Sequence, residues 1–258
     1  MDANASVITT RNLSKTFTTR VLHDINLDVK AGEIIGYIGP NGAGKSTTIK
    51  ILTGIIPDFE GDATVLGLDI RKDIIEVKKR IGYIPENAAL YETLTPLEYL
   101  LFIGQLYNMD RTHVARKVKD LLKLFDLGEY EEARMTTFSK GMRQKVLLIA
   151  GMLHNPSILF LDEPLSGLDA NAVILVKEIL TRLKRSGKTI FYSSHLMDVV
   201  EKISDRIMII NKGELIANGT FAELSSQAKS SLEQIFTDLT GSKEHESVAG
   251  QFIDILES

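Results

Sequence analysis

Apolar residues along the chain recur with two alternating periods. Short runs rich in β-branched side chains are typical of strands, and longer segments with apolar residues every three or four positions are typical of amphipathic helices. The runs predict strands at residues 33–38, 81–84, 158–161, 189–193 and 206–210. The longer segments predict helices at residues 45–53, 96–107, 113–125, 142–153, 170–185 and 198–203. This alternation predicts an α/β fold with a largely parallel sheet.

Two regions depart from the alternation. Residues 87–155 are almost entirely helical in pattern, which indicates a helical subdomain inserted in the α/β core. Residues 221–258 are rich in Ser, Glu and Lys, and we expect them to form a C-terminal helical appendage. The apolar residues of this appendage that would share one helical face are Leu232, Ile235, Phe236 and Leu239. That face would either pack on the core or dock a partner.

The composition narrows the class of protein. The 258 residues are 44% hydrophobic and 25% charged, so the chain can bury a core and is not disordered as a whole. A formal net charge of -4 argues against a dedicated nucleic-acid binder. The absence of cysteine excludes disulfide frameworks, zinc fingers and cysteine nucleophiles. With no secretory signal and no run of about 18 apolar residues, we expect a soluble chain that reaches a membrane only through a partner.

Residues 39–46 carry the strongest chemical signal. They read GPNGAGKS and match the phosphate-binding loop (Walker A) pattern G-x-x-x-x-G-K-[ST] in full, between a predicted strand and a predicted helix. Backbone N–H groups and the positive end of the helix dipole would face an anion there. Lys45 would hold the β- and γ-phosphates, and Ser46 would place a hydroxyl on Mg²⁺. The residues expected to bind the triphosphate are Gly39, Asn41, Gly42, Gly44, Lys45, Ser46 and Thr47.

Two acidic residues, Asp162 and Glu163, end the apolar strand at 158–161. Ligands gather outside the carboxyl ends of parallel strands, so Asp162 is placed to hold Mg²⁺ through its water shell. Glu163 would polarise the attacking water as a general base. Taken alone, the pair could be a solvated strand end. The phosphate-binding loop upstream favours the catalytic interpretation.

Further motifs follow these in a characteristic order. Residues 138–142 read FSKGM, residues 164–169 after the acidic pair read PLSGLD, and His195 follows the strand at 189–193. Together with the phosphate loop, this order resembles the nucleotide-binding subunit of an ABC transporter over roughly residues 7–220. The resemblance implies a P-loop NTPase core with a mixed, largely parallel sheet, an inserted helical subdomain and an antiparallel β edge. It also implies an ABC ATPase domain at residues 1–220.

The resemblance assigns roles to residues outside the phosphate loop. Ser139 and Gly141 match the signature residues that contact a γ-phosphate held by the opposite subunit. His195 matches the switch histidine that touches the same phosphate, and it joins Glu163 and Lys45 as a candidate catalytic residue. Phe17 matches the aromatic residue that stacks on adenine.

Two positions depart from the common pattern of the family. The usual signature is Leu-Ser-Gly-Gly-Gln, whereas residues 138–142 read FSKGM. Glu86 stands where the family usually has a glutamine that reaches Mg²⁺ and the attacking water. Both features resemble an exporter branch of the family, so activity is still implied. Because Glu86 occupies the position of a residue that reaches Mg²⁺, it is counted with Ser46 and Asp162 as an expected metal ligand.

The resemblance implies an ATP-hydrolysing subunit that binds Mg-ATP in a head-to-tail dimer. The second cassette would be either a copy of this chain or a different cassette. Closure of the dimer would drive export through a separate integral membrane permease, on the cytoplasmic face of the cell membrane. The alternative is a soluble ABC ATPase that acts on nucleic acid or ribosomes. Such proteins usually carry two cassettes or a long coiled coil, so we expect no nucleic-acid partner.

Overall fold

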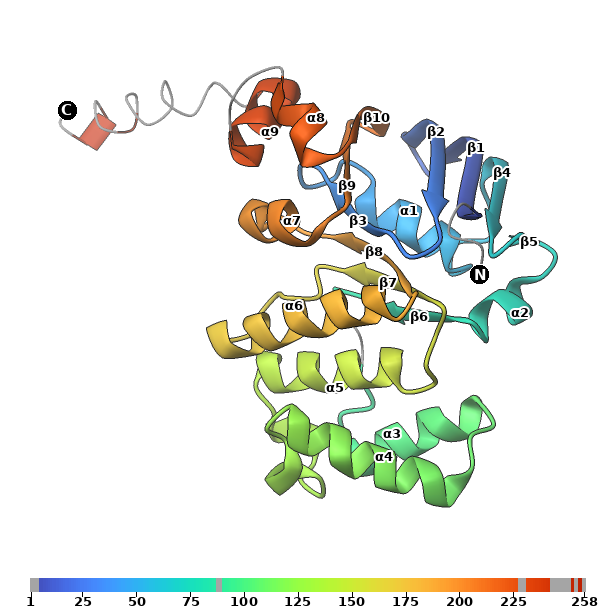
Figure 1. The fold of residues 1–258 in the computed structure, drawn as a ribbon, viewed down its shortest axis with the longest axis vertical. Coiled ribbons are helices and arrows are strands. Elements are labelled where there is room, and N and C mark those ends of the chain that lie inside the picture. Colours follow the sequence, from blue (N-terminus) through green and yellow to red (C-terminus); the bar gives the residue numbers. More distant parts are fainter. Residues whose placement is uncertain (1–4, 87–89, 227–230, 242–251, 253–254, 257–258) are drawn as a thin grey trace.

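Two β-sheets and the helices around them make up the structure, a computed structural model that describes residues 5–86, 90–226, 231–241, 252 and 255–256 (Figure 1). The larger sheet runs in the order β10 (Glu214–Gly219), β9 (Arg206–Asn211), β3 (Ile34–Ile38), β8 (Thr189–Ser193), β7 (Ile158–Asp162) and β6 (Ile81–Ile84). All of these strands are parallel except β10, which pairs antiparallel with β9. The largely parallel sheet expected from the alternation is confirmed.

The smaller sheet is antiparallel throughout. Its order is β2 (Arg20–Lys30), β1 (Ser6–Thr16), β4 (Glu60–Val65) and β5 (Leu68–Asp69). Together with β10, it accounts for the antiparallel β edge that the family resemblance implied.

Helices cover both faces of the larger sheet (Figure 1). The flanking helices are α1 (Lys45–Leu52), α5 (Lys140–Met152), α6 (Ala170–Arg185) and α7 (Met197–Ile203). Because successive strand residues point to opposite faces, Ile35 and Tyr37 pack with α1 and the smaller sheet, whereas Ile34 and Ile38 pack with α5, α6 and α7. Because both faces of the sheet are covered, every residue of β3, β7 and β8 is buried, and most of these residues are apolar.

The region expected to be helical begins at residue 87, and residues 87–89 lie outside the described part. The short helix α2 (Ile74–Lys78) and strand β6 precede this region, and its described part contains α3 (Pro96–Leu106), α4 (Arg111–Leu124), two 3-10 turns and α5. Helix α5 begins at Lys140, two residues before the predicted start at 142. The reason is a cap: the hydroxyl of Ser139 accepts a hydrogen bond from the Met142 N–H at 3.2 Å.

The C-terminal segment forms α8 (Phe221–Ser226) and α9 (Leu232–Thr240). Leu232 and Ile235 are buried in the same core as α7, so the prediction that this helical face packs on the core is confirmed for them. Leu239, on the same face, remains 44% exposed. Within the described part of the chain, none of the helices combines the length and apolar character needed to span a bilayer.

Candidate functional site

A cavity of about 690 Å³ opens at the carboxyl ends of β3, β7 and β8. The residues that line it are Val21, Asn41, Gly42, Ala43, Gly44, Lys45, Ser46, Thr47, Glu86, Asp162, Glu163 and His195. The fold thus brings together most of the residues singled out from the sequence, although they come from distant segments. Four of them are not among the lining residues: Phe17, Gly39, Ser139 and Gly141.

The phosphate-binding loop depends on glycine at the point where it enters α1. Gly42 and Gly44 have φ of +77° and +110°, a left-handed conformation that favours glycine. A Cβ on Gly44 would also lie 2.5 Å from Cδ2 of Leu22 on β2. The tight curl lets the loop run directly into α1, whose first backbone N–H groups have no partner within the helix. Such a helix start is suited to bind an anion.

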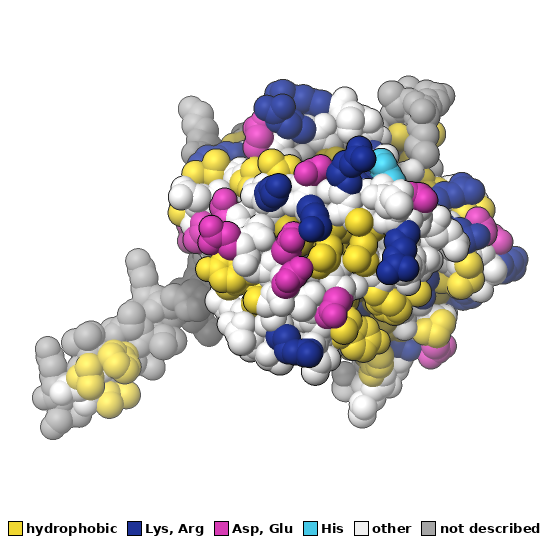
Figure 2. All heavy atoms as spheres, turned by 90° about the horizontal axis from the view of Figure 1, so that it is seen from below, with side chains coloured by type: hydrophobic (Ala, Val, Ile, Leu, Met, Phe, Trp, Pro, Cys, Tyr) yellow, Lys and Arg dark blue, Asp and Glu magenta, His cyan; other side chains and the backbone are white. Residues whose placement is uncertain are grey.

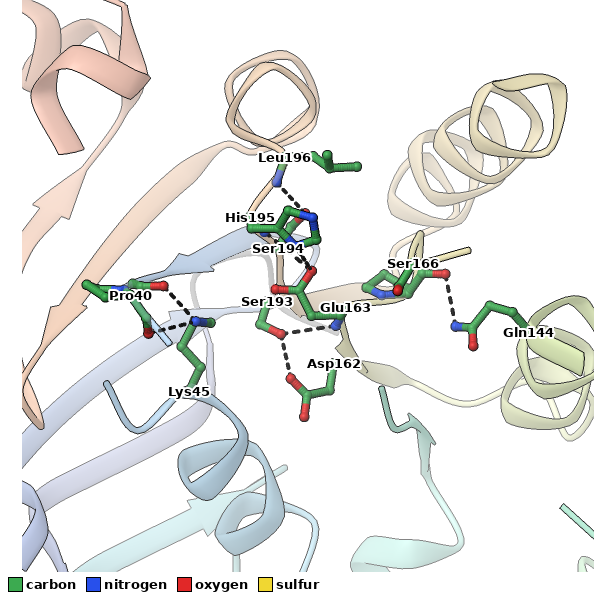
Figure 3. A network of polar contacts seen from close by, with 12 residues as sticks. Pro40, Lys45, Gln144, Asp162, Glu163, Ser166, Ser193, Ser194, His195 and Leu196 are labelled. Atoms are coloured by element: carbon green, nitrogen blue, oxygen red, sulfur yellow. Dashed lines mark hydrogen bonds and ion pairs between the residues drawn. The ribbon is translucent and has the colours of Figure 1, made fainter. Parts of the chain in front are cut away.

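Lys45 curls back over the loop from the first turn of α1 (Figure 3). Its ammonium donates hydrogen bonds to the carbonyl oxygens of Gly39 at 2.6 Å and Pro40 at 3.1 Å. Burial lowers the pKa of Lys45, and the carboxylates of Glu163 and Asp162 oppose that shift. The Gly39 carbonyl thereby contributes to the site although the residue does not line the cavity. A cation is held next to the place where an anion would bind.

Ser193, at the end of β8, contacts both Asp162 and the backbone of Glu163 (Figure 3). It pairs in register with Asp162 at the end of β7, and its hydroxyl donates a hydrogen bond to Oδ1 of Asp162 at 2.6 Å. The N–H of Glu163 donates to the same hydroxyl at 3.1 Å. Glu163 itself has a φ of +50°, so the chain turns sharply after β7. Sequence reasoning missed Ser193, for which a hydroxyl at the end of a fully buried strand is the one signal.

His195 contacts Glu163 twice from the loop after β8 (Figure 3). Its Nδ1 lies 2.7 Å from Oε2 of Glu163, and its backbone N–H donates to the same oxygen at 3.3 Å. The imidazole is 64% exposed, whereas the Glu163 side chain is only 12% exposed. The carboxylate therefore lies inside the cavity and the histidine at its rim.

Ser139 and Gly141 lie outside the cavity, at the start of α5, and Gly141 packs on the loop that follows Glu163. A Cβ on Gly141 would lie 2.6 Å from the carbonyl oxygen of Gly167. Further contacts to this loop come from two residues that sequence reasoning missed. Nζ of Lys140 donates to Oγ of Ser166 at 2.9 Å, and Nε2 of the buried Gln144 donates to the carbonyl of Pro164 at 3.0 Å.

Phe17 also lies outside the cavity, in the turn between β1 and β2. Its side chain is 55% exposed, and the ammonium of Lys15 lies 4.8 Å from the ring centroid. The turn is nevertheless close to the phosphate-binding loop, because Val21 of the adjoining strand lines the cavity.

Comparison with known proteins identifies the family of this chain. The family model described as "ABC transporter" matches residues 22–166. The linearmycin resistance ATP-binding protein LnrL of Bacillus subtilis (strain 168) is 37% identical over 217 residues, which cover 84% of this chain and 70% of the relative. The ABC transporter ATP-binding protein NatA of the same organism is 36% identical over 219 residues, covering 84% and 89% of the two chains.

Solved structures agree with this match. A structure described as the ATP-binding subunit of an ABC transporter has a TM-score of 0.85 at 32% identity, and the match covers 91% of this chain and 99% of that one. An ATP-binding cassette solved as a dimer in a post-hydrolysis state, bound to ADP and Pi, shares the fold with a TM-score of 0.77 at 23% identity, over 83% and 98% of the chains. The resemblance noted in the sequence and the predicted fold class are confirmed. The chain belongs to the ABC transporter family and is an ATP-binding subunit, an ATPase of the transporter.

Proposed function

We propose that this chain binds Mg-ATP together with a second cassette in a head-to-tail dimer and drives a separate membrane permease from the cytoplasmic face of the cell membrane. The observation that carries this proposal is the cavity that sets Lys45 and the phosphate-binding loop opposite Asp162, Glu163 and His195. A cation and helix N–H groups on one side suit the phosphates, and carboxylates on the other suit a metal and a water.

The oxygen donors in the cavity fit a magnesium ion. The hydroxyl of Ser46 and the carboxylates of Asp162 and Glu86 line the same cavity, and Mg²⁺ prefers oxygen ligands completed by phosphate and water. We propose these three side chains as the ones that would hold the ion, directly or through water. When bound, the ion would neutralise phosphate charge and polarise the bond to the terminal phosphoryl group.

Glu163 is proposed as the general base. The oxygen of a water would attack the γ-phosphorus while the bond from that phosphorus to the bridging oxygen of ADP breaks, and Glu163 would accept the water's proton. Lys45 would hold the β- and γ-phosphates throughout. The contact of His195 with Oε2 of Glu163 would keep the carboxylate oriented, and the exposed ring would lie against the γ-phosphate.

The position of Ser139 and Gly141 supports a dimer. Ser139 is exposed at the start of α5, so the N–H groups of this helix could meet a γ-phosphate bound by another cassette. Phe17, exposed beside the phosphate loop, would stack on adenine. The cassette compared above in its ADP- and Pi-bound state is likewise described as a dimer. Loss of the γ-phosphate would then release the two cassettes from each other.

The permease would dock beside the inserted helices. A groove of about 310 Å³ lies between α3 and α5 on one side and β6 on the other, with Tyr83, Pro85, Tyr99 and Ile103 among its lining residues. Glu86, which directly follows Pro85 in the chain, lines the nucleotide cavity. The groove and the nucleotide cavity are therefore adjacent. Figure 2, which faces α3 and α4, shows hydrophobic side chains among charged ones on this side of the molecule.

We propose export as the direction of transport, supported by the relative whose name assigns it to linearmycin resistance. The domain organisation that goes with this function is an ABC ATPase domain at residues 1–220, with a helical subdomain at about 87–155, and an appendage at residues 221–258.

Dimerisation of a hydrolysis-deficient variant tests the proposal. We expect purified Glu163→Gln to bind ATP and to sediment as a dimer when ATP and magnesium are present, because the nucleotide is retained between the cassettes. With EDTA in place of magnesium, or with Lys45→Ala added, it should sediment as a monomer. Failure of Glu163→Gln to capture ATP, or to pair at high concentration with ATP and magnesium, would overturn the proposal.

A further inference from the structure

Lys15 is a nearly buried cation at the end of β1, next to the turn that carries Phe17. Its side chain is only 6% exposed, and its ammonium lies 3.0 Å from Oδ2 of Asp58, in the segment that leads into β4. The same ammonium lies 4.8 Å from the centroid of the Phe17 ring. This distance is within the range of a cation–π interaction. The cation is thus in contact with both a carboxylate and an aromatic ring.

This arrangement lies beside the phosphate-binding loop. Lys15 pairs in register with Leu22, and a Cβ on Gly44 of the loop would lie 2.5 Å from Cδ2 of Leu22. Val21, next to Leu22, lines the nucleotide cavity. The turn that holds Phe17 therefore lies next to the part of the cavity wall that Val21 forms, and the proposed stacking would bring the base of a nucleotide to that side.

Phe17 is largely exposed on the turn that it occupies. It follows β1 in a three-residue turn, its N–H donates to the carbonyl of Thr19 at 3.0 Å, and its side chain is 55% exposed. An exposed aromatic side chain on a turn can adopt several rotamers, and fixing it when a ligand binds costs conformational entropy. A cation held against the ring reduces that cost before the ligand arrives.

We infer that Lys15 is a positioning residue for base recognition. Its ammonium, held by Asp58, orients the Phe17 ring so that the exposed part of the ring can stack on the flat base of a nucleoside triphosphate. This inference rests on the proposed role of Phe17 in nucleotide binding and names the residue that supports it. Since Lys15 acts through the ring, it contributes only to the part of the affinity that depends on the base.

Inorganic tripolyphosphate provides the matching probe because it has the phosphates of ATP and no base. We expect Lys15→Met to weaken ATP binding by about three- to tenfold, as for the loss of a cation from an aromatic ring, and to leave tripolyphosphate binding unchanged. The KM for ATP should rise by the same factor while kcat is retained. Lys15→Arg should preserve ATP binding, since a guanidinium also binds an aromatic face. Asp58→Asn, at an exposed carboxylate, should weaken ATP binding in the same selective way.

The outcomes separate the inference from the function on which it rests. If Phe17→Ala weakens ATP binding selectively but Lys15→Met and Asp58→Asn do not, the role of Lys15 is refuted and that of Phe17 stands. If Phe17→Ala leaves ATP binding unchanged, the proposed role of Phe17 fails, and the inference fails with it. Equal losses of ATP and tripolyphosphate binding in Lys15→Met and Asp58→Asn would assign both residues a merely structural role and overturn the inference.

Discussion

Nδ1 of His195 lies 2.7 Å from Oε2 of Glu163, and the backbone N–H of His195 donates to the same oxygen at 3.3 Å. Both contacts come from the loop after β8, whereas Glu163 follows β7. The carboxylate is therefore held by the neighbouring strand's loop rather than by its own. A change in that loop would change the orientation of the carboxylate directly.

Replacing the carboxylate of Glu163 by an amide should separate binding from hydrolysis. Glu163→Gln keeps the size of the side chain but removes the proton acceptor, so we expect phosphate release to fall by about a hundredfold or more while ATP binding is retained. Phosphate release and nucleotide binding measured on the same purified protein test this. A Glu163→Gln variant that hydrolyses ATP at the parental rate would show that another residue is the base.

Ser193→Ala should affect Asp162 and Glu163 at once. The variant removes the hydroxyl that donates to Asp162 and accepts from the Glu163 N–H, and it leaves a buried carboxylate oxygen without that donor. We expect a loss of about 1–3 kcal/mol in the free energy of unfolding and a lower rate of ATP hydrolysis. Urea unfolding and phosphate release provide the measurements. Ser186→Ala, at an exposed position after α6, is the control; equal behaviour of the two variants would contradict the role of Ser193.

The parallel strands and the phosphate loop could be predicted because each depends on residues that are close in sequence. The strand at Ile81–Ile84 and the helix at Ala170–Arg185 have the predicted bounds, since each is a continuous apolar or amphipathic segment. Strand β1 has no such pattern. Its pairing with β2 contains several register shifts, so buried and exposed residues do not alternate regularly.

Contacts between strands could not be predicted in the same way. Ser193 meets Asp162 because β8 and β7 pair in one particular register, and Lys15 reaches Asp58 because β4 pairs with β1. Neither register can be inferred from one continuous segment, because each depends on two strands that are distant along the chain. The roles assigned to Ser139 from the family pattern depend on a second cassette and stay predictions.

The stability of the protein should fall at acidic pH through His154. Burial lowers the pKa of this imidazole below its usual value of about 6.5; the ammonium groups of Lys117 and Lys188 add to the shift, and the hydrogen bond with the Ile81 carbonyl opposes it. The ring stacks on Tyr107 at 3.6 Å, Nε2 lies 2.9 Å from that carbonyl, and Nδ1 is buried without a partner among the described residues. A proton on Nδ1 would therefore have no acceptor there.

The sign of this effect follows from proton binding. Below about pH 6.5 the unfolded chain takes up a proton at His154 that the folded protein resists, so the free energy of unfolding decreases as the pH falls. We expect the melting temperature of His154→Gln to depend less on pH between about 7.5 and 5.5 than that of the parent. Thermal unfolding across this range measures it, and parallel pH profiles would refute the assignment.

Gly82→Ala should disturb the contact between β6 and α5. Both of these elements contribute residues to the proposed permease groove. A Cβ on Gly82 would lie 2.1 Å from the carbonyl oxygen of Gly151 on α5, and a backbone atom cannot move away without shifting the helix. We expect a loss of about 1–3 kcal/mol in the free energy of unfolding, measured in urea. Gly128→Ala is the control, because the nearest atom to its Cβ would be Cγ of the flexible Lys123 side chain, at 3.0 Å, and the nearest backbone atom would lie at 3.6 Å. If both variants unfold at the parental urea concentration, α5 is not held against β6 as closely as the structure requires.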